Sequence, residues 1–148
     1  MVANEVGMEA RLTMITLGVQ NLAVSREFYE KGLKWPVSPA SNDNVVFLRT
    51  GGVVLALFPS EELAKDAGVD PQGSGFRDFT IAHNVNSKEE VAQVLAQAEK
   101  AGGRIIKPAQ DVFWGGHSGY FEDPDRFLWE VAWNPLAPLN EKGEMQLP

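Results

Sequence analysis

Cysteine is absent from the 148 residues of this chain, and histidine occurs only twice. Without thiols the chain can form no disulfide framework, no thiolate metal site and no cysteine nucleophile, which fits a reducing compartment such as the cytoplasm. Any metal held by the protein would need histidine, aspartate or glutamate as its ligands. We therefore expect a cytoplasmic protein with few options for metal chemistry.

Positive charge and long apolar runs are also scarce. Thirteen Lys and Arg residues stand against 20 Asp and Glu residues, for a net charge of −7. Scattered basic residues disfavour nucleic acid or an anionic membrane as the partner, and no run approaches the roughly 18 to 20 apolar residues of a membrane helix. The first ten residues lack the pattern of a secretory signal. A small molecule or another protein remains as the partner.

The length suits one domain, and the order of the predicted elements suggests two similar halves. In the first half, residues 11–19 read as a strand and 21–33 as a helix. A short edge segment (35–39) and two strands (44–50 and 53–59) follow, and Gly51-Gly52 joins those two strands as a hairpin loop. This order is β-α-β-β-β.

The second half repeats that order after a short helix, 59–68, and a Gly-rich linker. We predict a strand at 76–85, a helix at 87–102, short strands at 104–108 and 112–114, and a hairpin over 116–133. Ser87 and Glu90 have the spacing of a capping box. The expected organisation is a flexible leader (1–10), one domain (11–133) made of module 1 (11–58), a linker with a short helix (59–76) and module 2 (77–133), and a tail (134–148).

Three segments resemble the vicinal oxygen chelate superfamily, which includes glyoxalase I, fosfomycin and bleomycin resistance proteins and extradiol dioxygenases. They are VQNLAVSREFYEKGL at 19–33, AEKAGGRI at 98–105 and GYFEDPDRFLWEV at 119–131. The resemblance implies an α+β fold in which two βαβββ modules form a curved mixed-sheet cup, with helices on the convex side. One such fold hosts many chemistries, so function has to come from the site.

The resemblance also implies where a family metal would be held, by one residue from the first and one from the last strand of each half. Those positions carry Met14, Ala56, Thr80 and Glu130. A lone carboxylate with Met, Ala and Thr does not complete a shell for a divalent metal. We predict no cofactor and a lost metal site, and we include Met14 and Thr80 among the ligand-binding residues.

The two histidines of the chain are the remaining candidates to replace the missing metal ligands. His83 lies three residues beyond Thr80, so strand parity directs it away from the cup. His117 follows two glycines, where strand pairing is open to irregularity, and we retain it as a candidate cup residue.

Hairpin pairing extends the candidate cup in module 1. If Thr50 pairs with Val53, then Phe47 opposes Ala56, and Arg49 and Phe58 share their face. We therefore predict that Arg49, Phe47 and Phe58 bind ligand. A solvated position for Arg49 at the rim is an equal alternative.

In module 2, Asp123-Pro124-Asp125-Arg126-Phe127 suits a three-residue hairpin loop with Arg126 at positive φ, where relatives usually have Gly. That register places Tyr120 opposite Glu130 and Ser118 opposite Ala132, all facing the cup. Trp129, Val131, Trp133 and Phe121 then face the helices. A four-residue loop would instead direct His117, Gly119 and Phe121 inward.

Aromatic residues on short segments are candidates to roof the pocket, and Trp114 is the stronger of them, ahead of Trp35. The stretch from Gly116 to Tyr120 resembles G-x-S-x-G, but it lacks the final Gly and lies on a hairpin, so a hydrolase nucleophile is not expected.

Three functions remain open. The leading hypothesis is a metal-free small-molecule binding protein with Glu130 and Tyr120 as anchors. The alternative is a glyoxalase-like isomerase or lyase in which an unpaired Glu130 is the catalytic general acid or base. The third is an inherited carboxylate with no present role, satisfied by Tyr120 or Ser118. Arg49 is the candidate ion-pair partner of Glu130, and by resemblance we expect a homodimer.

Overall fold

The computed structural model describes residue 8, residues 10–73 and residues 76–147. Most of the leader predicted at 1–10, the linker positions 74 and 75, and the last position of the predicted tail, 148, lie outside the described residues. The elements, in order, are β1 (Met14–Val19), α1 (Leu22–Glu27), the π-helical turn η1 (Phe28–Gly32), β2 (Val46–Arg49), β3 (Val54–Pro59), α2 (Ser60–Ala67), β4 (Ile81–Asn84), α3 (Lys88–Lys100), β5 (Arg104–Asp111), β6 (His117–Glu122) and β7 (Leu128–Trp133).

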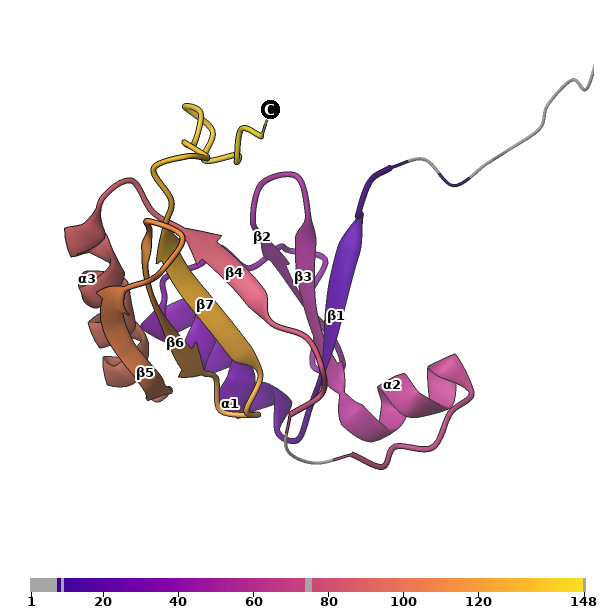
Figure 1. Ribbon diagram of the computed structural model, residues 1–148. Helices are drawn as coiled ribbons and strands as arrows, with labels where there is room; N and C mark the ends of the chain where they lie inside the picture. The colour runs from indigo at the N-terminus through magenta and orange to yellow at the C-terminus, as the bar shows by residue number, and fades with distance from the viewer. Residues whose placement is uncertain (1–7, 9, 74–75, 148) are drawn as a thin grey trace, which may run out of the picture.

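These strands form two mixed sheets, and the predicted repeat is visible in their topology. The first sheet has the order β1-β3-β2 and the second the order β4-β7-β6-β5. In each sheet the first strand of its half runs parallel to the last strand, which in turn pairs antiparallel with the strand before it. The α+β class is confirmed. Within one chain the two sheets are separate, and β1 lies at the far edge of the first sheet, away from β4 (Figure 1).

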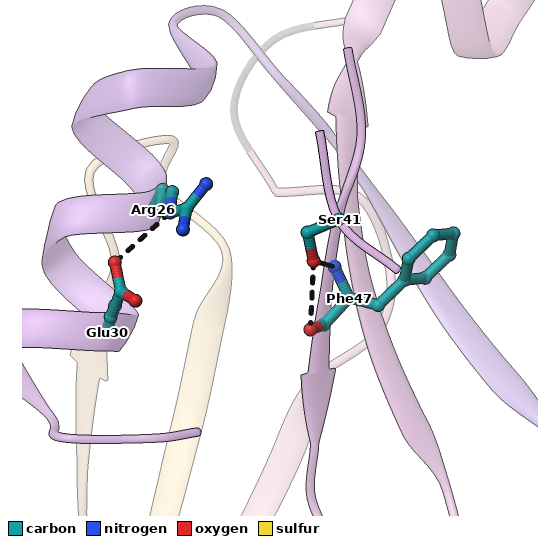
Figure 2. Close-up of polar contacts among 4 residues, drawn as sticks. All are labelled: Arg26, Glu30, Ser41 and Phe47. Carbon is teal, nitrogen blue, oxygen red and sulfur yellow. Dashed lines mark hydrogen bonds and ion pairs between the residues drawn. The ribbon is translucent and has the colours of Figure 1, made fainter. Parts of the chain in front are cut away.

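Local contacts fix the first half where its regular structure is short. Val37 makes a single bridge to Leu48, so the predicted edge segment at 35–39 is reduced to one pair. In Figure 2, the Ser41 hydroxyl accepts a hydrogen bond from the Phe47 amide at 2.9 Å and holds the preceding loop against β2. The same figure shows Arg26 paired with Glu30 at 3.1 Å, across the junction of α1 and η1.

The second half departs from prediction mainly at its edge strand. β5 extends to Asp111 and contains Pro108, with register shifts on both sides of Lys107. An edge strand tolerates proline because one row of its backbone groups needs no ladder partner. Residues 112–114, predicted as a strand, form the turn between β5 and β6 instead. The predicted strand at 76–85 is shorter, and only Ile81–Asn84 pairs.

Helix α3 begins as its sequence predicts. The carboxylate of Glu90 accepts hydrogen bonds from the Asn86 amide at 2.8 Å and from the Ser87 hydroxyl at 3.2 Å. The carboxylate thus binds the amide before the N-cap rather than that of the N-cap itself, and the Ser87 side chain caps no backbone amide, so the predicted capping box forms only in this altered version. The buried stripe of the helix is Val91, Leu95 and Ala98.

One hydrophobic core lies on the inner faces of both sheets. It joins Leu17 and Leu57 of the first sheet to Trp129 and Val131 of the second. Phe28, from η1, packs between them, with its ring 6.4 Å from that of Phe121. Side chains of the opposite strand parity therefore point away from this core, and we call that side of each sheet its outer face.

A buried polar network, the Asp123 clamp, ties the first half to the β6–β7 hairpin. The Tyr29 hydroxyl donates to the Asp123 carboxylate at 2.7 Å and accepts from the Trp129 indole N–H at 3.1 Å. The other carboxylate oxygen accepts from the amides of Asp125 and Phe127, both at 2.9 Å. The clamp closes the hairpin turn and positions it on η1.

Candidate functional site

The outer face of the second sheet carries the polar residues that the sequence singled out. Tyr120 lies opposite Glu130, and Ser118 lies opposite Ala132. The predicted three-residue loop is confirmed, since the Arg126 amide donates to Asp123 O, the Asp123 amide donates to Phe127 O, and Arg126 has φ 67°. Trp129, Val131 and Phe121 lie in the core, as that register predicts. The local turn chemistry therefore sets the direction of Glu130.

Tyr120 and Glu130 interact on this face, and both are half-buried. Burial raises the pKa of Tyr120, and the charge of Glu130 and a side-chain hydrogen bond to Glu130 raise it further. The phenol therefore remains protonated at neutral pH and serves as a hydrogen-bond donor. Because the single proton of the phenol is engaged by Glu130, the pair offers a ligand the acceptor lone pairs of the phenol and of the carboxylate, side by side. Ser118 is buried beside them, at 5% exposure.

The module 1 candidates share the outer face of the other sheet. Phe47 opposes Ala56, and Phe58 lies two residues along the same strand, so the predicted pairing is confirmed. Met14 pairs with Val54 on β1 and lies on the same side of the sheet as Ala56. Because each outer face points away from the shared core, one chain does not bring these residues to Tyr120 and Glu130.

Arg49 lies at the end of β2 and is exposed, opposite Val54. Within the described part of the chain no ion pair joins it to Glu130, whose charge acts on Tyr120 instead. Arg49 does line a cleft, but that cleft lies between the two sheets rather than over Glu130.

Three other candidates lie elsewhere. His117 is on the inner face of β6, where its ring Nδ1 is 2.9 Å from Asp111, so its placement in the cup was wrong. Strand parity explains the error, since the three-residue loop that directs Tyr120 outward directs His117 toward α3. Trp114 packs over Gly116 in the β5–β6 turn and is not among the residues that line the cleft. Thr80 is exposed and precedes β4.

The family metal does not fit the donor set that this chain offers. Of the four positions that correspond to metal ligands, only Glu130 carries a charged donor, and Met14 and Ala56 lie on the other sheet. No group of three histidine, cysteine, aspartate or glutamate side chains among the described residues could hold a metal ion. His83 lies opposite Val131, on the inner side of β4, so its side chain points away from the outer face as strand parity predicted.

Sequence reasoning missed the cleft between the sheets. It has a volume of about 830 Å³, and its walls include Trp35, Trp129, Ile81, His83, Arg49 and Lys142. Burial lowers the pKa of His83, although the charge of Glu90 opposes this shift. The side of the sheet on which Trp129 lies was predictable from the hairpin. A cleft between two modules depends on tertiary packing, which no local sequence pattern encodes.

Two mixed sheets of similar topology, with a polar pair facing each other across the last two strands, are the features that define the class of protein. The model of the Glyoxalase/Bleomycin resistance protein/Dioxygenase superfamily matches residues 11–131, and the chain belongs to this family. No protein of curated function matches the chain. None of the helices in the described residues is long and apolar enough to cross a membrane.

Solved structures agree with this assignment. A glyoxalase-related enzyme from Fulvimarina pelagi is 34% identical, with a TM-score of 0.85 over 94% of this chain and 99% of that one. A family enzyme from Burkholderia phytofirmans PsJN is 20% identical, with a TM-score of 0.73 over 84% of this chain and 98% of that one. A lactoylglutathione lyase from Agrobacterium tumefaciens is 20% identical, with a TM-score of 0.66 over 87% and 97%. The last two likenesses concern the fold alone.

Proposed function

We propose that this protein binds a small oxygenated molecule on the outer face of the second sheet, without the family metal. The observation that carries the proposal is the position of Tyr120 directly opposite Glu130. A phenol whose proton is engaged by a neighbouring carboxylate presents acceptor oxygens, so the pair recognises a ligand that donates hydrogen bonds, such as a hydroxy ketone or a phenol. The single carboxylate among the four metal positions supports the metal-free form of the proposal.

Removing either partner of this pair should weaken binding. We expect Glu130→Gln and Tyr120→Phe each to raise the Kd for such a ligand by about tenfold, because a hydrogen bond to a charged group contributes roughly 1.5–3 kcal/mol. A thermal-shift screen of hydroxy ketones and phenols, followed by calorimetry on the best of them, measures this change.

Glu122→Gln is the matched control, since Glu122 lies on the same strand and the same side as Tyr120 but is already paired with Arg104 at 3.0 Å. Its affinity should equal that of the wild type. Stoichiometric metal in the purified protein, or unchanged affinity in both the Glu130 and the Tyr120 variants, would contradict the proposal.

Catalysis by Glu130 is the second candidate. The relative at 34% identity is described as a glyoxalase-related enzyme, and a half-buried carboxylate beside a phenol has the groups needed to accept and return a proton. In this case Glu130→Gln would keep the ligand affinity and lose turnover. Loss of affinity and turnover together would favour an anchoring role.

We also propose that a second copy of the chain completes the site. Met14, Phe47, Ala56 and Phe58 lie on the other sheet of the same chain, so an apolar wall for Tyr120 and Glu130 has to come from elsewhere. Light scattering coupled to size-exclusion chromatography should give twice the 16.2 kDa chain mass at micromolar concentration. A monomer that binds ligand with full affinity would contradict this arrangement.

A further inference from the structure

The cleft between the two sheets has the size and the walls of a second ligand site. Its volume of about 830 Å³ is within the usual range for small-molecule pockets, roughly 300–1,000 Å³. Ile15 and Leu55 line it from the first sheet, Ile81 from the second and Val94 from α3. Glu130 and Tyr120 are not among its lining residues.

Two tryptophans form an aromatic wall. The rings of Trp35 and Trp129 meet edge to face, with centroids 5.6 Å apart and an interplanar angle of 78°. Trp129 is 5% exposed and fixed by its hydrogen bond to Tyr29, whereas Trp35 is half-buried and presents part of its ring. Edge-to-face rings of this kind leave a face on which a further planar ring can stack.

The position of Trp35 requires an unfavourable backbone conformation at the residue before it. Lys34 precedes it at φ 63°, a conformation that costs a non-glycine residue roughly 1 kcal/mol. This turn brings the Trp35 amide to within 3.0 Å of the Tyr29 carbonyl oxygen and directs the chain back over η1. The aromatic wall is thus held by the backbone as well as by packing.

The charges of the cleft favour an anion. Arg49 and Lys142 line it, and within the described part of the chain neither makes an ion pair. Among the described residues of the lining, Glu90 is the one acid, and the start of α3 already uses its carboxylate. Two free cations against one engaged carboxylate stand out in a chain of net charge −7.

The C-terminal tail places one of these cations. Leu139 bridges Met145, and the Asn140 side chain accepts hydrogen bonds from the amides of Lys142 and Glu144 at 2.9 Å each. Leu139, Lys142 and Gly143 thereby form one wall of the cleft. The tail predicted at 134–148 therefore contains a defined turn.

We propose that the cleft between the sheets is a second binding site, for a planar aromatic molecule that carries a carboxylate. The ring stacks against Trp35, and the carboxylate lies between Arg49 and Lys142. Asn84 and Gln93, which also line the cleft, supply carboxamide groups for any further polar substituent on the ring.

The test uses 1-naphthoate and the full-length protein, with binding followed by tryptophan fluorescence. We expect saturable quenching in the wild type, and a Kd about fivefold to tenfold higher in Arg49→Gln and in Lys142→Gln, because each removes one partner of an anion. Both residues are at the surface, so neither change should disturb folding. Lys107→Gln removes the same charge from exposed β5, outside the cleft, and should leave the Kd unchanged.

Two further comparisons separate this site from its alternatives. 1-Naphthalenemethanol, which lacks the carboxylate, should bind less well to the wild type and equally to all three variants. Tyr120→Phe should leave naphthoate binding intact, so a failure of the proposed function would not affect this result. The proposal would be overturned if naphthoate bound with equal affinity to the wild type, Arg49→Gln and Lys142→Gln. It would also be overturned if the affinity fell as the protein dimerised, because a second copy would then cover the cleft.

Discussion

Replacing Asp123 with alanine should lower the free energy of unfolding by about 3–4 kcal/mol, because buried donors left without an acceptor cost roughly 1–3 kcal/mol each. Asp123 is 2% exposed and accepts three hydrogen bonds, from the Tyr29 hydroxyl and from the amides of Asp125 and Phe127. Chemical denaturation of the two proteins, with far-UV circular dichroism as the signal, measures the difference.

The same change should loosen the candidate site. The clamp closes the turn that places Tyr120 opposite Glu130, so its loss should speed hydrogen exchange at the Phe127 amide and weaken ligand binding on that face. Glu122→Ala, which removes a carboxylate from the same hairpin outside the clamp, is the control. A loss of less than about 1 kcal/mol in Asp123→Ala would mean that the clamp adds little to stability.

The register of this hairpin was predictable because the information is local. Five residues, Asp123 to Phe127, contain a proline suited to a type I turn and an acid that accepts amides within the turn. Once the loop length is set, strand parity directs Tyr120, Ser118 and Glu130 to one face without further assumptions. The Gly-Gly loop gave the pairing of Phe47 with Ala56 for the same reason.

Contacts between the halves were not predictable in this way. Arg49 was a reasonable partner for Glu130 on the assumption of one cup in one chain, but the two residues lie on separate sheets. The placement of His117 failed because it treated a Gly-Gly sequence as a source of irregular pairing, whereas β6 pairs regularly from His117 onward. The first error concerns how the two sheets are placed and the second concerns strand pairing, and neither concerns which elements form.

The cleft between the sheets was not predictable from the sequence either, because it also depends on how distant elements pack. Trp129 was assigned to the core by parity, and it is indeed buried. Its role as a cleft wall depends on Trp35, which follows the positive φ of Lys34, and on the tail turn between Leu139 and Met145, beyond the end of β7. No pattern in the sequence marks Lys34 for that conformation, since lysine has no special preference for it.

The Asp123 clamp also predicts how stability depends on pH. Burial raises the pKa of Asp123 from 3.8 to about 6, although the hydrogen bonds from Tyr29, Phe127 and Asp125 oppose this shift. The folded protein therefore holds a proton at Asp123, between pH 4 and about 6, that the unfolded chain releases. The stabilisation from this proton is fully present below pH 4 and is lost as the pH rises through 6.

Comparison with Asp123→Asn isolates this effect, because the amide keeps an acceptor oxygen but does not titrate. From pH 7 to pH 4, the stability of the wild type relative to the variant should rise by up to about 3 kcal/mol, which corresponds to a shift of about two pKa units. Other carboxylates titrate in both proteins, so their contributions cancel in the difference. Urea denaturation at several pH values measures it. A difference that stays constant, or that grows as the pH rises, would mean that the three hydrogen bonds outweigh burial and that Asp123 is ionised in the folded protein throughout this range.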